Sequence, residues 1–176
     1  MILNRIPYQY FITKGAGSSN YEVHAGSYHM ALFDAGISDY NIQTYSSVLP
    51  STAIEVPKNF ITPPFGSELY TIMSCIHGNQ NDYISCGIIT GELFDNDKKI
   101  GGLVCEVSGK YDENTELMIQ LQQTINDLHQ RTYNQYSLLN LKTITNSFQC
   151  EDKYGTCLVA VCFVSFQNYG GLYNRA

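Results

Sequence analysis

The first residues to consider for chemistry are two adjacent serines, Ser46 and Ser47, near the end of a strand-like segment. Over residues 41–48 two sets of side chains alternate, which is the period of a half-buried strand. Pro50 must end this strand, because proline has no amide donor and pushes its neighbour toward extended geometry. The serine pair is therefore predicted to lie at a tight turn. Taken alone, such a pair is also typical of a polar step on the exposed face of a strand.

Glu106 is the second candidate, because it is an acidic residue within an otherwise apolar, strand-like run. Its neighbours Cys105 and Val107 are expected to face the opposite side of that strand. If Glu106 points into a pocket, desolvation raises its pKa and makes a neutral carboxylic acid available as a proton donor. The alternative is a glutamate on a solvated face of the sheet.

Other catalytic arrangements find little support in the sequence. The GxSxG motif of serine hydrolases is absent, and no histidine has a Cys or Asp at a spacing typical of a nucleophile and its base. The six cysteines are isolated and lack the paired spacing of a zinc site, so we expect no bound metal. We expect buried, reduced thiols instead. These cysteines are Cys75, Cys86, Cys105, Cys150, Cys157 and Cys162.

The composition indicates one globular domain with a rather uncharged surface. The chain has 176 residues, of which 44% are hydrophobic and 15% are charged. Its net charge of −6, with ten basic residues and no basic run, argues against a nucleic-acid partner. No apolar stretch is long enough to span a membrane and no secretory signal is visible, so we expect no membrane partner and a cytoplasmic location. The low charge and the fourteen tyrosines favour contacts between copies of the chain.

Hydrophobic periodicity predicts an α+β fold with one long helix over residues 115–133. A shorter helix is expected over residues 28–35, with Ser27 as its N-cap and Gly36 directly after its end. Residues 14–20, which contain Gly-Ala-Gly, are predicted to form a loop. The apolar stripe of the long helix consists of Leu117, Leu121, Ile125 and Leu128. Strands are expected at residues 8–13, 41–48, 69–76, 83–89, 100–107, 139–148 and 156–166, the last of them central, with a polar, mobile tail from residue 167.

Four blocks of the sequence together carry a resemblance to a known family. The blocks are residues 28–41 (YHMALFDAGISDYN), 46–50 (SSVLP), 99–110 (KIGGLVCEVSGK) and 154–163 (YGTCLVAVCF). In this order and at roughly this spacing, they resemble the pyruvoyl-dependent arginine decarboxylases over most of the chain. The resemblance implies a four-layer αββα sandwich, in which two packed, mainly antiparallel sheets lie between outer helices. It also implies a homotrimer, alone or stacked as a hexamer, with active sites between protomers.

The resemblance implies that the chain makes its own cofactor. Decarboxylation of an amino acid leaves a carbanion, and a carbonyl that condenses with the substrate amine can delocalise that charge. By resemblance, the Ser47 hydroxyl attacks the carbonyl carbon of Ser46, and elimination and hydrolysis leave a pyruvoyl group at position 47. The single-domain proenzyme would thereby become two chains, residues 1–46 (β chain) and 47–176 (α chain). Asn41 would donate a hydrogen bond during cleavage, and Glu106 would protonate the carbanion. The implied reaction converts arginine to agmatine and carbon dioxide.

One position departs from the pattern of the family. The family has an aspartate that faces the basic end of the substrate from a neighbouring protomer, whereas this sequence has His29 there, directly after the aromatic Tyr28. A histidine cannot supply the permanent negative charge that pairs with a guanidinium. Asp34, Glu22 and Asp39 are nearby in the sequence, but none is assigned to this role by its position.

Three alternatives therefore stay open beside arginine decarboxylation. The first is the same chemistry on a different amino acid, which the histidine at position 29 motivates. The second is an uncleaved, oligomeric homologue without catalytic activity. The third is a small ligand-binding module in which the serine pair is accidental.

Overall fold

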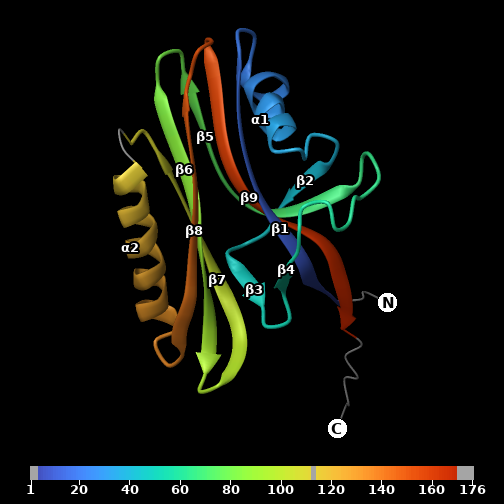
Figure 1. Ribbon diagram of the computed structural model, residues 1–176, viewed down its shortest axis with the longest axis vertical. Helices are drawn as coiled ribbons and strands as arrows, with labels where there is room; N and C mark the ends of the chain where they lie inside the picture. Colours follow the sequence, from blue (N-terminus) through green and yellow to red (C-terminus); the bar gives the residue numbers. More distant parts are fainter. Residues whose placement is uncertain (1–3, 112–113, 170–176) are drawn as a thin grey trace.

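The computed structural model describes residues 4–111 and 114–169, which form a four-layer sandwich (Figure 1). Two sheets pack face to face, with helix α1 (His29–Asp34) outside the five-stranded sheet and helix α2 (Asn114–Thr132) outside the four-stranded sheet. The predicted α+β, αββα architecture is confirmed. The strands are β1 (Asn4–Ser19), β2 (Asn41–Thr44), β3 (Val48–Pro50), β4 (Ile54–Glu55), β5 (Glu68–Asn79), β6 (Tyr83–Asp95), β7 (Lys98–Gly109), β8 (Ser137–Gln149) and β9 (Tyr154–Tyr169).

The two sheets are built mainly from antiparallel neighbours. The strand order is β2-β5-β9-β1-β4 in the larger sheet and β3-β7-β6-β8 in the smaller one. The exceptions are the pairs β1–β4 and β2–β5, which are parallel. β9 lies in the middle of the larger sheet, as its nearly continuous run of apolar residues predicts.

Three apolar layers hold the sandwich together. The layer between the sheets contains Ile72, Ile88, Val161 and Phe163, all of them buried. A second layer joins α1 to the outer face of the larger sheet, and a third joins α2 to the smaller sheet. The predicted stripe of α2 is confirmed. Its buried members are Leu117, Leu121 and Ile125, and Leu128 packs against them.

The prediction of a loop over residues 14–20 is wrong, because β1 continues to Ser19 and pairs with β9 along this stretch. The glycines serve packing here. A Cβ at Gly15 would lie 2.2 Å from the carbonyl oxygen of Ala31, and one at Gly17 would lie 2.5 Å from Met30 Cβ. The two glycines therefore allow α1 to lie directly on the strand.

Helix α1 ends as predicted but begins differently. Gly36 has φ of 64°, and the amide of Ile37 donates to the carbonyl of Leu32 at 2.9 Å, which is a Schellman ending. At the other end, a wide π-helical turn, η1 (Val23–Tyr28), precedes α1. Ser27 is not the N-cap, because its buried hydroxyl is hydrogen-bonded at 2.8 Å to that of Thr156.

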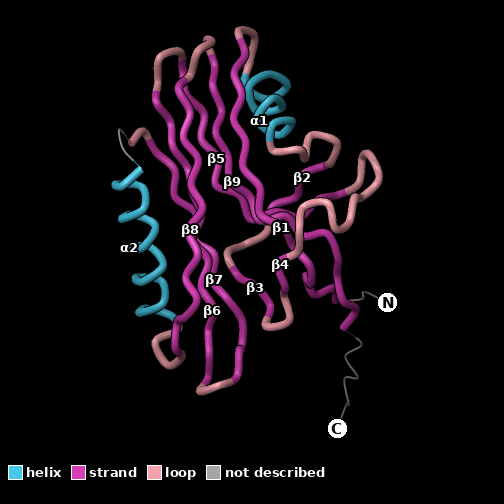
Figure 2. The backbone as a smooth tube through the Cα atoms, in the orientation of Figure 1, coloured by secondary structure: helices cyan, strands magenta, loops and turns pink. Residues whose placement is uncertain are grey.

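The strand predicted over residues 41–48 is divided between the two sheets. β2 pairs with β5 in the larger sheet, whereas β3 pairs with β7 in the smaller sheet. Residues 45–47, which we call the crossing, carry the chain from one sheet to the other (Figure 2). An alternating pattern reports which side chains are half-buried, but it does not report which sheet buries them.

Two smaller predictions have mixed outcomes. The cysteines are free thiols, five of them buried and Cys75 half-buried, as expected. The polar tail was expected from residue 167, but residues 167–169 still belong to β9, and the rest of that segment lies outside the described residues.

Within the parts of the chain that the structure describes, no helix has the length and apolar character needed to cross a membrane.

Candidate active site

The crossing brings Ser47 into contact with Glu106. β3 pairs with β7 so that Val48 lies opposite Leu103, and the amide of Val104 donates to the carbonyl oxygen of Ser47 at 2.9 Å. Glu106 lies one step further along the same face of β7. Its Oε2 accepts a hydrogen bond of 2.9 Å from Ser47 Oγ. The pairing of two strands thus joins residues that are 59 positions apart in the sequence.

Glu106 points into the space between the two sheets. Val104 packs in the layer between the sheets, whereas Cys105 and Val107 pack beneath α2, so the alternation along β7 places Glu106 on the side of Val104. Burial raises the pKa of the Glu106 carboxyl, and the hydrogen bond from Ser47 opposes this shift without reversing it. The carboxyl therefore keeps its proton to higher pH than an exposed glutamate does.

The peptide bond between Ser46 and Ser47 is exposed and already polarised. The amide of Val48 donates to the carbonyl oxygen of Ser46 at 2.9 Å, which closes a γ-turn around Ser47. Ser46 is exposed and Ser47 is half-buried. A donor on this oxygen is in place to stabilise negative charge that develops there. Ser47 is not among the residues with positive φ, so accessibility rather than backbone strain marks this peptide.

Asn41, the expected donor to the Ser46 carbonyl, has a different partner in this protomer. It begins β2, and its Nδ2 donates to the carbonyl oxygen of Gly66 at 2.7 Å. Its own amide donates to the carbonyl of Ser67 at 2.8 Å. Asn41 thus ties the start of β2 to the loop before β5, and its role in cleavage stays a prediction.

A cavity of about 480 Å³, which we call the outer pocket, opens between η1, α1 and β2. Tyr28 and His29, the two residues expected to bind substrate, both line it, as does Asn41. It lies beside α1, which covers the outer face of the larger sheet, and neither Ser47 nor Glu106 is among its lining residues. The full lining is His24, Ala25, Tyr28, His29, Leu32, Ser38, Tyr40, Asn41, Ile42, Gln43 and Thr44.

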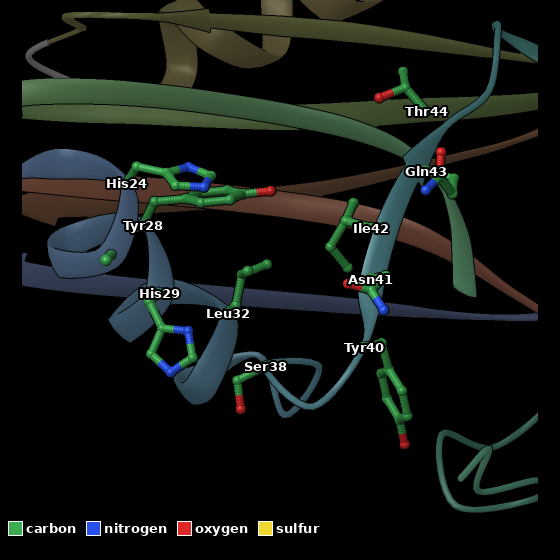
Figure 3. Close-up of a pocket in the computed structure, with 11 residues that line it drawn as sticks. His24, Tyr28, His29, Leu32, Ser38, Tyr40, Asn41, Ile42, Gln43 and Thr44 are labelled. Carbon is green, nitrogen blue, oxygen red and sulfur yellow. The ribbon is translucent and has the colours of Figure 1, made fainter. Parts of the chain in front are cut away.

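The aromatic rings of the outer pocket are arranged in two directions (Figure 3). His24 stacks on Tyr28 with ring centres 5.9 Å apart, and the Tyr28 hydroxyl points toward β2. The ring of His29 lies on the other side of Leu32, toward Ser38. Tyr28 therefore presents a hydroxyl to the outer pocket, whereas His29 presents an imidazole.

No acidic side chain is found among the described residues that line the outer pocket. None of the three nearby acids is among the residues that line the pocket. Asp34 Oδ2 accepts from the amide of Ala16 at 2.9 Å, Glu22 caps η1 through the amide of Ala25, and Asp39 is an exposed acceptor for Ser38. The carboxylate that is missing at position 29 is thus not replaced by one of these neighbours within the protomer.

Three groups that contribute to the crossing or to the outer pocket were not predicted from the sequence. The amide of Val48 leaves no signature in the sequence, because every residue but proline has such a donor. His24 appeared only as a scattered histidine, and its stacking on Tyr28 depends on the π-helical turn. Beneath that turn, His77 Nδ1 is hydrogen-bonded at 2.8 Å to the same Thr156 hydroxyl that contacts Ser27.

The sequence matches the family model described as pyruvoyl-dependent arginine decarboxylase over residues 9–168, nearly the whole chain. The chain belongs to the pyruvoyl-dependent arginine decarboxylase family. A search of curated proteins finds no match. The name of the family indicates decarboxylation of an amino acid and a pyruvoyl prosthetic group.

The residues around position 47 fit the chemistry that such a group requires. A serine hydroxyl is held against a carboxyl whose pKa is raised, and the neighbouring peptide carbonyl already accepts a hydrogen bond. A metal would need a different set of side chains. In residues 4–111 and 114–169, no group of three or more His, Cys, Asp or Glu is arranged to hold one.

Proposed function

We propose that this protein is an amino-acid decarboxylase that makes its pyruvoyl group from Ser47, with arginine as the first substrate to test. Membership in the family supports the reaction class. The observation that carries the assignment of residues is the hydrogen bond between Ser47 Oγ and Glu106 Oε2 at the point where the chain crosses between the sheets. No other serine of the described residues donates to a glutamate in this way.

The proposed processing uses only atoms of the chain and one water molecule. Ser47 Oγ attacks the carbonyl carbon of Ser46, the nitrogen of residue 47 leaves, and an ester replaces the peptide bond. The Val48 amide stabilises the oxygen of Ser46 in this step. Loss of the Cα proton of residue 47 then breaks the bond between Cβ and Oγ, which releases the Ser46 carboxylate. Addition of water and loss of ammonia leave a ketone at position 47.

Glu106 has one position and two proposed tasks. Before cleavage it orients the Ser47 hydroxyl and accepts its proton. After cleavage, the pyruvoyl group supplies an electron sink for the carbanion that decarboxylation leaves. Glu106 then lies beside position 47 as a carboxylic acid that can return a proton to the substrate carbon. Burial between the sheets supports this second task, because it favours the protonated form.

An intact mass spectrum under denaturing conditions tests the proposal. We expect two chains, residues 1–46 and 47–176, with the larger one lighter by one ammonia than a chain that begins with serine. A single chain of full length after long incubation at mildly raised temperature would instead support the uncleaved homologue. Release of carbon dioxide from a panel of amino acids then identifies the substrate.

A second candidate substrate class is favoured by the lining of the outer pocket. Among the described residues, its ionisable side chains are two histidines and two tyrosines, and none is a carboxylate that could pair with a guanidinium. If this pocket receives the distal end of the substrate from a neighbouring protomer, an amino acid with a neutral or acidic side chain suits it better than arginine. The same panel of amino acids separates the two classes.

We also propose that the protein assembles as a homotrimer, alone or stacked as a hexamer. Large apolar side chains are exposed near α1 and in the connection between β4 and β5, notably Phe33, Phe60 and Phe65. Exposed aromatic residues at this density are typical of surfaces that bind another protein chain. Light scattering coupled to size-exclusion chromatography should give the mass of three or six processed protomers. A monomer at micromolar concentration would contradict this assembly.

A further inference from the structure

A second cavity lies beside Ser46 and shares no lining residue with the outer pocket. It has a volume of about 360 Å³, and we call it the Ser46 cavity. Tyr45, Ser46 and Val48 line it, together with three apolar residues that follow or face them. Arg5, from the start of β1, is the one charged residue among its described lining.

Arg5 is held in place by aromatic rings rather than by an acid. Its guanidinium carbon lies 5.3 Å from the ring centre of Tyr70 and 4.9 Å from that of Phe166. One nitrogen donates to the Tyr70 hydroxyl at 2.9 Å, and that hydroxyl donates to Glu68 at 2.7 Å. Among the described residues, none of the salt bridges involves Arg5. A guanidinium has five N–H donors, so most of them remain available to a ligand.

The proposed processing creates a negative charge at this point. Cleavage between Ser46 and Ser47 converts the carbonyl of Ser46 into a carboxylate. The new end at position 47 is a ketone, which carries no charge, whereas ordinary hydrolysis would have produced an ammonium group. The reaction therefore leaves an anion without a matching cation, at a residue that shares its cavity with a positioned arginine.

We propose that Arg5 is the binding site for the new carboxylate of Ser46 and so holds the end of the 46-residue chain in the Ser46 cavity after cleavage. This inference rests on the proposed self-processing. Arginine suits the task, because its planar fork matches the two oxygens of a carboxylate. Glu106 is not among the residues that line the Ser46 cavity, so a carboxylate bound to Arg5 there would be held apart from it. Arg5 acts as a positioning residue, since it does not touch the reacting atoms.

The test compares Arg5→Gln in two backgrounds, the processed protein and the uncleaved Ser47→Ala chain, which lacks the attacking hydroxyl. Mass spectrometry first establishes the state of cleavage in every sample. The half-life of each folded protein in urea at low ionic strength is then measured. Arg5 and Ser46 are both exposed, so in the processed protein we expect Arg5→Gln to shorten the half-life by about two- to fivefold, the size expected of an exposed ion pair. The effect should shrink in high salt.

The uncleaved background separates the carboxylate from the other contacts of Arg5. Loss of the contacts with Tyr70 and Phe166 affects both backgrounds equally, so we expect a clearly smaller change in the Ser47→Ala chain. Arg5→Lys keeps the charge without the fork and should give an intermediate half-life in the processed protein. Lys98→Gln, which removes one positive charge at the exposed start of β7, is the matched control and should change neither background.

Two negative results have different meanings. Equal effects of Arg5→Gln in the two backgrounds would overturn the role of Arg5 while leaving self-processing in place. A parent protein that is never cleaved would overturn the proposed processing, and the anchor with it, because no carboxylate would then exist at Ser46.

Discussion

The crossing and the outer pocket differ in how they are assembled within one protomer. At the crossing, the pairing of β3 with β7 puts Ser47 and Glu106 in direct contact. The outer pocket is a cavity beside α1, lined by η1, α1 and β2, and its lining does not include the serine pair. The proposed reaction centre is thus fixed by strand register, whereas the pocket is a surface whose chemistry depends on a few side chains. If the two regions act as proposed, a change such as histidine at position 29 should alter substrate choice without disturbing the contact between Ser47 and Glu106.

The largest expected effect comes from removing the nucleophile at the crossing. Ser47→Ala should abolish both cleavage and decarboxylation, because no hydroxyl remains to attack the Ser46 carbonyl. Ser46→Ala is the matched control and should still be cleaved, since the carbonyl of residue 46 reacts and its hydroxyl does not. Mass spectrometry measures both outcomes. Cleavage of the Ser47→Ala chain between residues 46 and 47 would contradict the proposal that the Ser47 hydroxyl is the nucleophile.

Glu106→Gln should lower kcat by about 10² to 10⁴, the usual contribution of a general acid. Gln keeps an acceptor for the Ser47 hydroxyl but cannot take or give the proton, so cleavage should be slower and still reach completion. In the unmodified enzyme, activity should fall as pH rises through the pKa of Glu106, which burial raises. Ser108→Ala, an exposed change on the same strand, serves as the control. A fully active Glu106→Gln enzyme would show that Glu106 is not the general acid.

His29→Asp tests whether the outer pocket determines the choice of substrate. If His29 faces the distal end of the substrate, an aspartate there should raise kcat/KM for arginine by about tenfold to a hundredfold through a charge-assisted hydrogen bond. Cleavage and kcat for smaller substrates should change little. Met30→Asp adds the same charge at the next, exposed position, outside the lining of the pocket, and should not help. Equal gains in the two variants would indicate a general effect of charge.

His77 offers a smaller test of how the outer pocket is supported. Burial lowers the pKa of His77 below its usual value of 6.5, so the folded state binds fewer protons than the unfolded state. Its contribution to stability is therefore fully present above pH 6.5 and is lost as pH falls through the window below that value. Because His77 is exposed, its effect is small: over this pH window the Tm of His77→Asn should vary less than that of the parent protein, by at most about 2 °C. The exposed change Asn79→Ala, on the same strand, should leave the slope unaltered.

Several features of the molecule could be predicted from the sequence alone, because they depend on local patterns. The stripe of α2 follows from helical periodicity, and the end of α1 follows from the positive φ that Gly36 accepts. The burial of the cysteines and the place of β9 follow from apolar runs. The four blocks of sequence also predict the family, and the family model confirms it.

The tertiary structure alone decided how the candidate residues meet. The alternating segment over residues 41–48 is divided between two sheets, and Ser47 is hydrogen-bonded to Glu106. Gly15 and Gly17 are the positions where α1 packs directly on β1. The tertiary structure also placed Arg5 and Ser46 in the lining of one cavity, and it put no carboxylate of the described residues into the lining of the outer pocket. These outcomes depend on strand pairing and helix packing between residues far apart in the chain. A local pattern specifies which face of a strand is buried, but the partner that buries it is chosen only when the whole chain has folded.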